Sequence, residues 1–404
     1  MREPVKWAPN AMPKTDGTKS LSLMTTAEMA TAIRFHRSFP QYAETPLVHL
    51  SCLADHIGVK GVFLKDESYR FNLNAFKVLG GSYAIGKYIA KELGKDIAEL
   101  DYATLVSEET RQKLGNITFY TATDGNHGRG VAWAANKLGQ KSVVFMPSGS
   151  SQTRLRNIKN EGADATITEL NYDDAVRLAS AKASQDPHGV VVQDTAWEGY
   201  EEIPSWIMQG YGSMSLEALQ QLKEAQVDRP THVFVQAGVG SFAGAVIGHL
   251  ANLFPDNPPV MTLVEASAAD NHYLSNLAGS LLGVKGNLTT LMAGLACGEG
   301  STISWDILKN HAHFFVSAPN WLASRGMRIL AAPLRGDQPV ISGESGAVTT
   351  GLLYTILKDA EYQGFRDALG LNADSVVLLF STEGNTDPEK YRDIVWDGDF
   401  PSHE

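Results

Sequence analysis

The chain of 404 residues is long enough for two or three domains of ordinary size. Hydrophobic residues make up 43% of the chain and charged residues 20%, a composition that excludes a disordered or fibrous protein. The net charge of −11, from 34 Lys and Arg against 45 Asp and Glu, argues against nucleic-acid and membrane partners, because both need a basic protein surface. A small molecule, cationic or zwitterionic, is the expected partner.

The chain also lacks the features of a secreted or membrane protein. Its two cysteines, Cys52 and Cys297, are too few for a disulfide framework, which favours a reducing, cytoplasmic compartment. The first residues, MREPVKWAPNAMPK, have no long apolar core of the kind found in signal peptides. The longest clean apolar runs, such as residues 376–380, have the length of a strand and not of a membrane span.

Short β-branched runs alternate with segments of helical length along most of the chain. The runs predict strands at 61–67, 116–121, 142–146, 164–169, 189–193, 231–236, 260–265, 314–317 and 375–380. Helices are expected at about 76–93, 151–161 and 172–185, and the charged stretch 91–113 is expected to be a helical insertion on the surface. This alternation predicts an α/β fold with parallel sheets covered on both faces. Ligands bind at the carboxyl ends of such strands, so a site is expected in the loops that follow them.

Lys77 is the first candidate in chain order. It lies in the apolar segment Ala75-Phe76-Lys77-Val78-Leu79, at the start of a predicted helix that follows a strand. Desolvation and the positive end of the helix dipole would both lower the pKa of its amine. A lysine in this state suits Schiff-base chemistry. Taken alone, a lysine that extends its ammonium to solvent is the simpler interpretation.

Two loops with carboxylates follow predicted strands. Residues 121–128, TATDGNHG, offer side-chain acceptors, an amide and exposed backbone N–H groups together. Asp124 could equally be the N-cap of an ordinary helix, and His127 on its own is expected to be structural. Asp194 follows the strand at 189–193, so a parallel sheet would turn it toward the same crevice, although Asp is also a common turn former.

A glycine-rich segment, residues 237–244 (AGVGSFAG), joins a predicted strand to a predicted helix. Its glycines allow a tight turn, and consecutive backbone N–H groups at a helix N-terminus form a cradle for an anion. A phosphate site is therefore favoured over a plain packing turn. Glu265 ends the next strand, where a Rossmann unit has its ribose-binding carboxylate, so the loop alone leaves open which phosphate compound binds.

Late in the chain, glycine-punctuated loops with hydroxyl groups occur at 342–347 and 381–385. No metal site is expected. His311 and His313 alternate on a predicted strand, but they have no cysteine or carboxylate at the spacing of metal ligands.

The order of these segments resembles the fold type II, or tryptophan synthase β-like, pyridoxal-phosphate enzymes. In that family a lysine follows Ser-Phe, then come a Ser-Gly-Asn-His loop, a glycine-rich phosphate loop and a late Ser-Gly-Gly-Asn. The corresponding segments here are Ala75-Phe76-Lys77, Asp124-Gly125-Asn126-His127, 237–244 and Thr382-Glu383-Gly384-Asn385. Four motifs in the family's order, spread over most of the chain, are far more specific than any one of them.

The resemblance implies pyridoxal 5′-phosphate as the cofactor and a role for each motif. Lys77 would bond covalently to the cofactor, Asn126 would hydrogen-bond its phenolic oxygen, and Thr382 would contact its pyridine nitrogen. The substrate carboxylate would lie on the loop that contains Thr121, Thr123, Asp124, Gly125 and Asn126. The cofactor phosphate would lie on the backbone amides of Gly238, Val239, Gly240, Ser241 and Phe242.

The same resemblance implies the domain organisation and the assembly. A large cofactor-binding domain would comprise residues 1–110 and 191–404, and a small α/β domain residues 111–190. The family also suggests a homodimer.

Two aspartates depart from the dehydratases and serine racemase of this family. Asp124 stands where they have serine, on the side of the cofactor opposite the lysine. It could therefore take a proton from a D isomer while Lys77 serves the L isomer. Asp194 adds a carboxylate that could pair with a substrate amine, or donate a proton to it. Because a buried charge needs a partner, the resemblance implies 2,3-diaminopropionate as substrate and its α,β-elimination to pyruvate and two ammonia, a reaction of amino-acid catabolism.

Three alternatives remain open at this point. A serine or threonine dehydratase of the same fold is disfavoured by Asp124 and Asp194. A nicotinamide-dependent dehydrogenase could be built on the loop 238–244 and Glu265, but it would leave Lys77 and the Asp124 loop without roles. A non-catalytic carrier of pyridoxal phosphate would need the lysine but not the paired aspartates.

Overall fold

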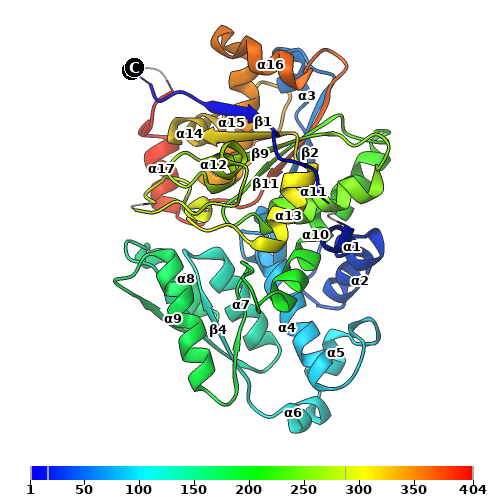
Figure 1. Cartoon of the computed structure of the whole chain (residues 1–404), viewed down its shortest axis with the longest axis vertical. Helices are drawn as coiled ribbons and strands as arrows, with labels where there is room; N and C mark the ends of the chain where they lie inside the picture. Colours follow the sequence, from blue (N-terminus) through cyan, green and yellow to red (C-terminus); the bar gives the residue numbers. More distant parts are fainter. Residues whose placement is uncertain (1, 16–17, 287, 403–404) are drawn as a thin grey trace.

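The computed structural model describes residues 2–15, 18–286 and 288–402. Within them the strands form two sheets, a larger one in the order β1-β10-β9-β8-β11-β3-β2 and a smaller one in the order β6-β5-β4-β7. Figure 1 shows the smaller sheet, with its helices, in the lower part of the molecule and the larger sheet in the upper part.

The strands of the larger sheet are β1 (Lys6–Pro9), β2 (Leu47–His49), β3 (Gly61–Asp66), β8 (His232–Gln236), β9 (Val260–Ala266), β10 (Phe314–Ala318) and β11 (Val376–Ser381). Those of the smaller sheet are β4 (Thr118–Ala122), β5 (Lys141–Met146), β6 (Asp164–Ile167) and β7 (Gly189–Val191). Neighbouring strands are parallel, except that β1 and β2 pair antiparallel at the two edges of the larger sheet. The predicted α/β fold with parallel sheets is therefore confirmed.

Each strand predicted from the sequence is present, with its ends within two residues of the prediction. The sequence did not predict β1 and β2, because edge strands of four and three residues carry almost no periodicity. The prediction that His311 and His313 share a strand is wrong. His311 ends helix α13, and His313 lies between that helix and β10.

The α-helices are α1 (Thr18–Ser22), α2 (Thr26–Arg37), α3 (Ser51–Ile57), α4 (Val78–Glu92), α5 (Tyr102–Leu105), α6 (Glu108–Leu114), α7 (Asn126–Lys137), α8 (Gln152–Asn160), α9 (Tyr172–Gln185), α10 (Glu202–Glu224), α11 (Ser241–Leu253), α12 (Asn271–Ala278), α13 (Thr302–His311), α14 (Asn320–Ala331), α15 (Glu344–Lys358), α16 (Gln363–Leu369) and α17 (Pro388–Val395). Short 3-10 helices are η1 (Glu67–Asn72), η2 (Ile97–Glu99), η3 (Ala293–Leu295) and η4 (Ala360–Tyr362). In the described part of the chain no helix is long and apolar enough to cross a membrane.

The charged stretch 91–113 is helical, as predicted, but in three short pieces: η2, α5 and α6. Each begins at a side chain that accepts a hydrogen bond from a backbone N–H two or three residues later. These capping residues are Asp96, Asp101 and Ser107. Because each cap satisfies a backbone donor at a helix start, it defines where the next short helix begins.

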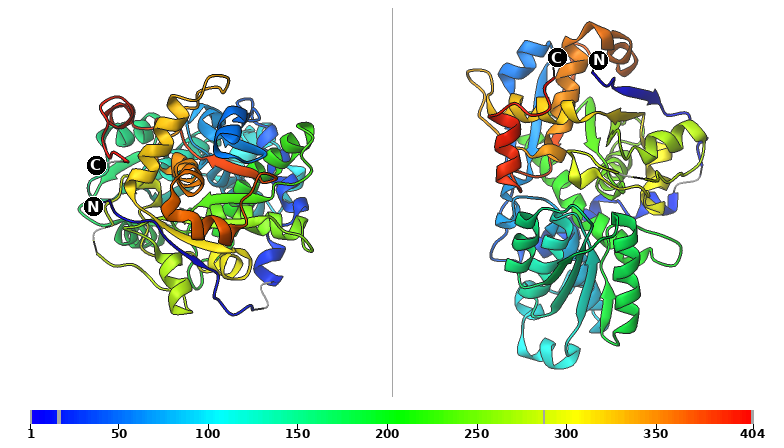
Figure 2. Two further views of the ribbon diagram at one scale, coloured as in Figure 1. Left: turned by 90° about the horizontal axis from the view of Figure 1, so that it is seen from above. Right: turned by 90° about the vertical axis from the view of Figure 1, so that its left-hand side faces the viewer.

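Alternation of side chains along the buried strands divides the core of the larger sheet. On β11, Leu378 and Phe380 belong to the apolar cluster that includes α10 and α11. Val377 and Leu379 belong to the cluster that includes α14 and α15. Helices therefore cover both faces of this sheet, as continuous apolar strands require. At the far end of the molecule the described chain ends meet, since Arg2 donates to the carbonyl of Ser402 at 3.0 Å (Figure 2).

Candidate active site

A pocket lies where the carboxyl ends of β3, β8 and β11 face those of β4 and β7. Loops after these strands supply its walls, as the parallel-sheet argument predicts. The predicted site residues that line it are Lys77, Thr123, Asp124, Asn126, Asp194, Gly238, Val239, Gly240, Ser241, Phe242 and Thr382.

Two predicted substrate-binding residues, Thr121 and Gly125, are not among the lining residues. Thr121 is fully buried, and its hydroxyl donates to the Gln193 amide oxygen at 2.9 Å. Gly125 donates its backbone N–H to the Thr123 hydroxyl at 2.9 Å. Both residues shape the loop from within instead of facing the pocket.

Lys77 and Asp194 form an ion pair in the pocket. Lys77 precedes α4, and Asp194 follows β7 with 1% of its side chain exposed. Burial disfavours the Lys77 ammonium, but the Asp194 carboxylate outweighs burial and raises the pKa of Lys77. Burial likewise disfavours the Asp194 carboxylate, yet His127 and Lys77 hold the pKa of Asp194 below its usual range. The lowered lysine pKa predicted from the helix start is wrong, because the local sequence does not reveal this carboxylate.

Two tyrosines that the sequence analysis did not select hold the Asp194 carboxylate in place. The Tyr211 hydroxyl, from α10, donates to one carboxylate oxygen at 3.4 Å. The Tyr172 hydroxyl, at the start of α9, donates to the other oxygen at 3.4 Å and accepts from the Gln193 amide at 2.9 Å. Asp194 therefore presents a carboxylate of fixed orientation to a cation.

The fold has two units, one built on the smaller sheet and one on the larger sheet. The amide of Asn126 points into the pocket from the first unit, and the hydroxyl of Thr382 from the second. Asn126 donates to Glu383 at 2.5 Å, and Glu383 also accepts from the backbone N–H of Ser345 at 3.1 Å. Thr382 accepts from the Gln236 amide at 2.9 Å. No role for Gln236 was predicted from the sequence; its signal is a polar residue directly after the apolar run 233–235 of β8. Its amide oxygen is buried without a hydrogen-bond partner in the described residues.

The glycine-rich loop forms an anion cradle at the start of α11. Gly240 has a φ of +95°, a left-handed conformation that favours glycine, and Ser241 begins the helix. A Cβ at Gly238 would lie 3.0 Å from the Cys297 sulfur across the pocket wall. The first N–H groups of a helix have no acceptor within it, so they are available to an oxyanion. The loop therefore fits the phosphate of pyridoxal 5′-phosphate.

A second carboxylate centre surrounds Asp124. Its carboxylate lies 3.6 Å from the guanidinium of Arg154, which donates to Glu344 at 3.0 Å. Burial raises the pKa of Asp124, and Arg154 and Lys77 oppose that rise. Burial and the neighbouring Glu383 raise the pKa of Glu344 to about 7. Arg154 belongs to no motif in the sequence, and Glu344, although it lies in the glycine-punctuated segment 342–347, was expected in a loop and given no role; it begins α15.

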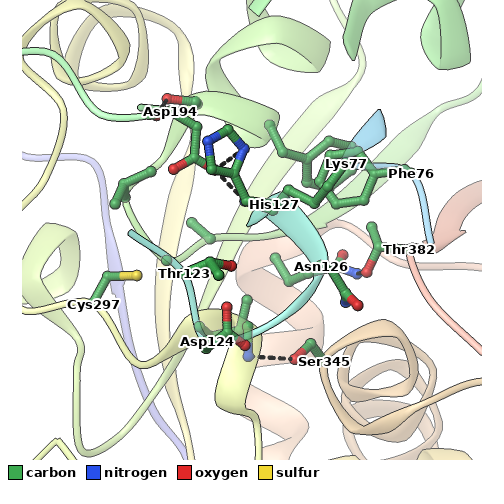
Figure 3. Close-up of a pocket in the computed structure, with 18 of the residues that line it drawn as sticks. Phe76, Lys77, Thr123, Asp124, Asn126, His127, Asp194, Cys297, Ser345 and Thr382 are labelled. Carbon is green, nitrogen blue, oxygen red and sulfur yellow. Dashed lines mark hydrogen bonds and ion pairs between the residues drawn. The ribbon is translucent and has the colours of Figure 1, made fainter. Parts of the chain in front are cut away.

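The two carboxylate centres lie apart within one pocket. In Figure 3, Lys77 and Asp194 are at one end of the labelled side chains and Asp124 is at the other, beside Ser345. Thr123 and Asn126 lie between the two ends. A ligand held in the pocket would therefore have a carboxylate near each end.

Glu265 is not available to a nucleotide ribose. One of its carboxylate oxygens accepts from the backbone N–H and the ring Nδ1 of His272, at 3.0 and 2.7 Å. The other accepts from the backbone N–H of Tyr273 at 2.7 Å. The fully buried carboxylate thus caps the start of α12. The dehydrogenase alternative needed Glu265 to bind a ribose, so this arrangement argues against it.

Comparison with known proteins agrees with this geometry. The family model described as pyridoxal-phosphate dependent enzyme matches residues 39–381. The diaminopropionate ammonia-lyase of Salmonella typhimurium is 50% identical over 402 residues, which cover 98% of this chain and 99% of the relative. That of Escherichia coli K12 is 47% identical over 378 residues, 93% of each chain. The crystal structure of the Escherichia coli enzyme in complex with an aminoacrylate-PLP azomethine reaction intermediate has a TM-score of 0.88 and 44% identity over 98% of both chains.

The match extends over more than half of the chain and includes Lys77, the Asp124 loop and the glycine-rich loop. The cofactor is therefore pyridoxal 5′-phosphate, and a nicotinamide-dependent dehydrogenase is excluded. The chain belongs to the fold type II pyridoxal-phosphate-dependent enzymes and, among them, to the diaminopropionate ammonia-lyases.

Proposed function

We propose that the chain eliminates ammonia from both D- and L-2,3-diaminopropionate. One water is consumed, and one pyruvate and two ammonia are released. When bound, pyridoxal 5′-phosphate supplies the electron sink that stabilises negative charge at the substrate Cα. The observation that carries the proposal is the placement of two carboxylates, Asp124 and Asp194, at opposite ends of the pocket that contains Lys77.

Residues from both units of the fold would hold the cofactor. Lys77 would bond to its aldehyde carbon, and the loop 238–242 would bind its phosphate through backbone N–H groups. Asn126 would hydrogen-bond the phenolic oxygen. Thr382, whose hydroxyl Gln236 already orients, would contact the pyridine nitrogen. The buried amide oxygen of Gln236, which lacks a partner in the described residues, supports a polar ligand at this point.

Two groups would exchange protons with the substrate Cα. The amine of Lys77 would remove the proton of the L isomer from one side of the cofactor. The carboxylate of Asp124 would remove the proton of the D isomer from the other side. Both tasks need a positioned base, and the separation of the two residues across the pocket supports the division between isomers.

Asp194 would select the substrate through its second amine. The carboxylate already pairs with an ammonium group, that of Lys77, and its two tyrosine contacts would keep it oriented for another. An amino acid with a β-hydroxyl would leave this buried charge without a partner, which is costly. Asp194 would act as the charge partner of the leaving amine, because its lowered pKa keeps the carboxylate ionised.

Turnover of a small panel of amino acids tests the proposal. The purified holoenzyme is assayed with D- and L-diaminopropionate, D- and L-serine and L-threonine, and both pyruvate or oxoacid and ammonia are measured. We expect diaminopropionate to have the highest kcat/KM, with two ammonia per pyruvate against one for serine. A higher kcat/KM for serine or threonine would instead identify a dehydratase.

The remaining expectations concern organisation and location. We expect a cytoplasmic homodimer that serves amino-acid catabolism, in keeping with two unpaired cysteines. Light scattering should give twice the chain mass of 43.7 kDa. The proposed domains remain residues 1–110 with 191–404, and residues 111–190. Limited proteolysis would locate the boundary between the domains. Helix α4 packs against both α7 and α10, so it lies at this boundary.

A further inference from the structure

Arg154 joins the two units of the fold next to the Asp124 loop. It lies on α8, beside the smaller sheet, and is 8% exposed. Its guanidinium donates to Glu344, the first residue of α15 beside the larger sheet, at 3.0 Å. A second nitrogen of the same guanidinium lies 3.6 Å from the Asp124 carboxylate. One buried cation therefore serves two carboxylates from different units.

The side chain of Arg154 is held in this position from several directions. The backbone N–H of Arg154 donates to the Ser151 hydroxyl, the N-cap of α8, at 3.1 Å. Its aliphatic stem packs on Gly125, where a Cβ would come within 2.9 Å of the arginine Cδ. The arginine stem therefore lies directly against the residue that follows Asp124.

The two contacts of the guanidinium differ in kind. The contact with Glu344 has the length of a charge-assisted hydrogen bond, whereas 3.6 Å to Asp124 is an ion pair without a hydrogen bond. Glu344 therefore anchors the arginine. The positive charge of Arg154 stabilises the Asp124 carboxylate without a hydrogen bond to it. Asp124 lines the pocket, and its oxygens can accept a proton from a ligand there.

We propose that Arg154 is a positioning residue which, anchored by Glu344, holds the Asp124 carboxylate as the proton acceptor for the D isomer. The inference rests on the proposed function, in which Asp124 removes that proton. Burial works against an ionised Asp124, and Arg154 is the first of the groups that oppose this effect.

Other groups also face Asp124 from the surrounding elements. Lys77, at the start of α4, favours the carboxylate, and Glu383, after β11, disfavours it. The Tyr172 hydroxyl and the Cys297 thiol face it as uncharged groups, because burial raises the pKa of both. Glu344 acts on Asp124 through the guanidinium that the two carboxylates share.

The pH dependence of kcat/KM, measured separately for D- and L-diaminopropionate, tests the inference. Arg154→Met should lower kcat/KM for the D isomer about 100-fold and shift the acidic limb of its profile to higher pH, because the base loses its cation. Glu344→Gln should leave the same limb near its parent position, because burial and Glu383 raise the pKa of Glu344 to about 7 and the carboxyl is already largely protonated there. For the L isomer, kcat/KM should change less than about threefold across the pH range in both variants.

Three further variants distinguish a specific effect from a loss caused by misfolding. The double variant Arg154→Met with Glu344→Gln removes both members of the buried pair together, and it should still show the D-selective loss. Arg154→Lys keeps a cation and should recover part of the D activity. Arg156→Met, on the exposed face of the same helix, should leave both profiles unchanged.

The possible outcomes separate this inference from the proposed function. Equal losses on both isomers, with no shift of the D limb in Arg154→Met and the double variant, would make Arg154 merely structural and overturn the inference. If Asp124→Asn still loses activity mainly on the D isomer in the same assays, the proposed function stands even though the role of Arg154 has failed. If Asp124→Asn affects both isomers equally, the division of bases fails and the role of Arg154 fails with it.

Discussion

Lys77 and Asp194, which lie 117 positions apart in the sequence, form the central ion pair of the pocket. The carboxylate stabilises the lysine as an ammonium, and Tyr211 and Tyr172 fix the orientation of the carboxylate. With the lysine nitrogen bonded to the cofactor aldehyde, as proposed, Asp194 would be the buried anion next to the reaction centre. A cationic substrate amine would then be the partner that restores its charge balance.

Replacement of this anion should discriminate between substrates. In Asp194→Asn we expect kcat/KM for both isomers of diaminopropionate to fall about 100- to 4,000-fold, because a buried charge pair is broken at a cost of about 3–5 kcal/mol. D-serine, which has no second amine, should lose much less. Asp174→Asn, on the exposed face of α9, is the matched control. A similar loss for serine and diaminopropionate would exclude a role in amine recognition.

Asp124→Asn should separate the two isomers. We expect at least a 100-fold loss of kcat with D-diaminopropionate, the range lost when a general base is removed, and substantial retention with the L isomer. Steady-state assays on the resolved isomers measure both values. Equal loss on the two isomers would contradict the assignment of Asp124 and Lys77 to opposite sides of the cofactor.

Lys77→Ala should remove the visible absorption band that a lysine-bound cofactor gives, because the covalent bond can no longer form. Spectra of the purified variant with added pyridoxal 5′-phosphate measure this directly. Lys87→Ala, further along α4, is the control and should retain the band. An unchanged band in Lys77→Ala would show that another lysine holds the cofactor.

Gly240→Ala should weaken cofactor binding while the fold remains. An alanine at φ +95° is strained by about 1–2 kcal/mol, and its Cβ would lie 2.7 Å from Nε2 of the buried His272. The phosphate cradle must therefore shift. We expect the Kd for pyridoxal 5′-phosphate, measured by fluorescence titration, to rise at least about tenfold. Gly364→Ala, where nothing lies within 4 Å of the added Cβ, should leave the Kd unchanged.

The buried cluster of Glu217, Arg70 and Lys65 predicts an acid-sensitive stability. Glu217 lies 2.7 Å from Arg70 and 2.8 Å from Lys65. Burial favours the neutral acid, but the two cations prevail and lower the pKa of Glu217 from 4.5 to about 2. The stability from this lowered pKa, about 3 kcal/mol, is therefore fully present above pH 4.5 and lost as the pH falls toward 2.

Urea unfolding between pH 7 and pH 3 measures this contribution. Glu217→Gln should lower the free energy of unfolding at pH 7 and flatten its decline below pH 4.5. Glu224→Gln, at the exposed end of the same helix, should keep the steep decline of the parent chain. An equally steep decline in Glu217→Gln would assign the acid sensitivity to other carboxylates.

Local sequence was enough to predict the alternation of strands and helices, the loops at the strand ends and the order of the cofactor motifs. These features depend on residues close together in the chain: apolar runs define strands, and glycines and capping side chains define turns and helix starts. The motifs alone predicted several of the residues that line the pocket: Lys77, Asp124, Asn126 and the loop 238–242.

Tertiary structure decided which of these groups interact. The raised pKa of Lys77 and the bridge from Arg154 to Glu344, 190 positions apart, depend on which strand ends meet across the pocket. Thr121 was expected to bind substrate, yet it lies in β4, and its hydroxyl donates to the amide oxygen of Gln193, which follows the neighbouring strand β7. Pairing between buried charges is set by the order of strands in the two sheets, and no local spacing of residues encodes that order.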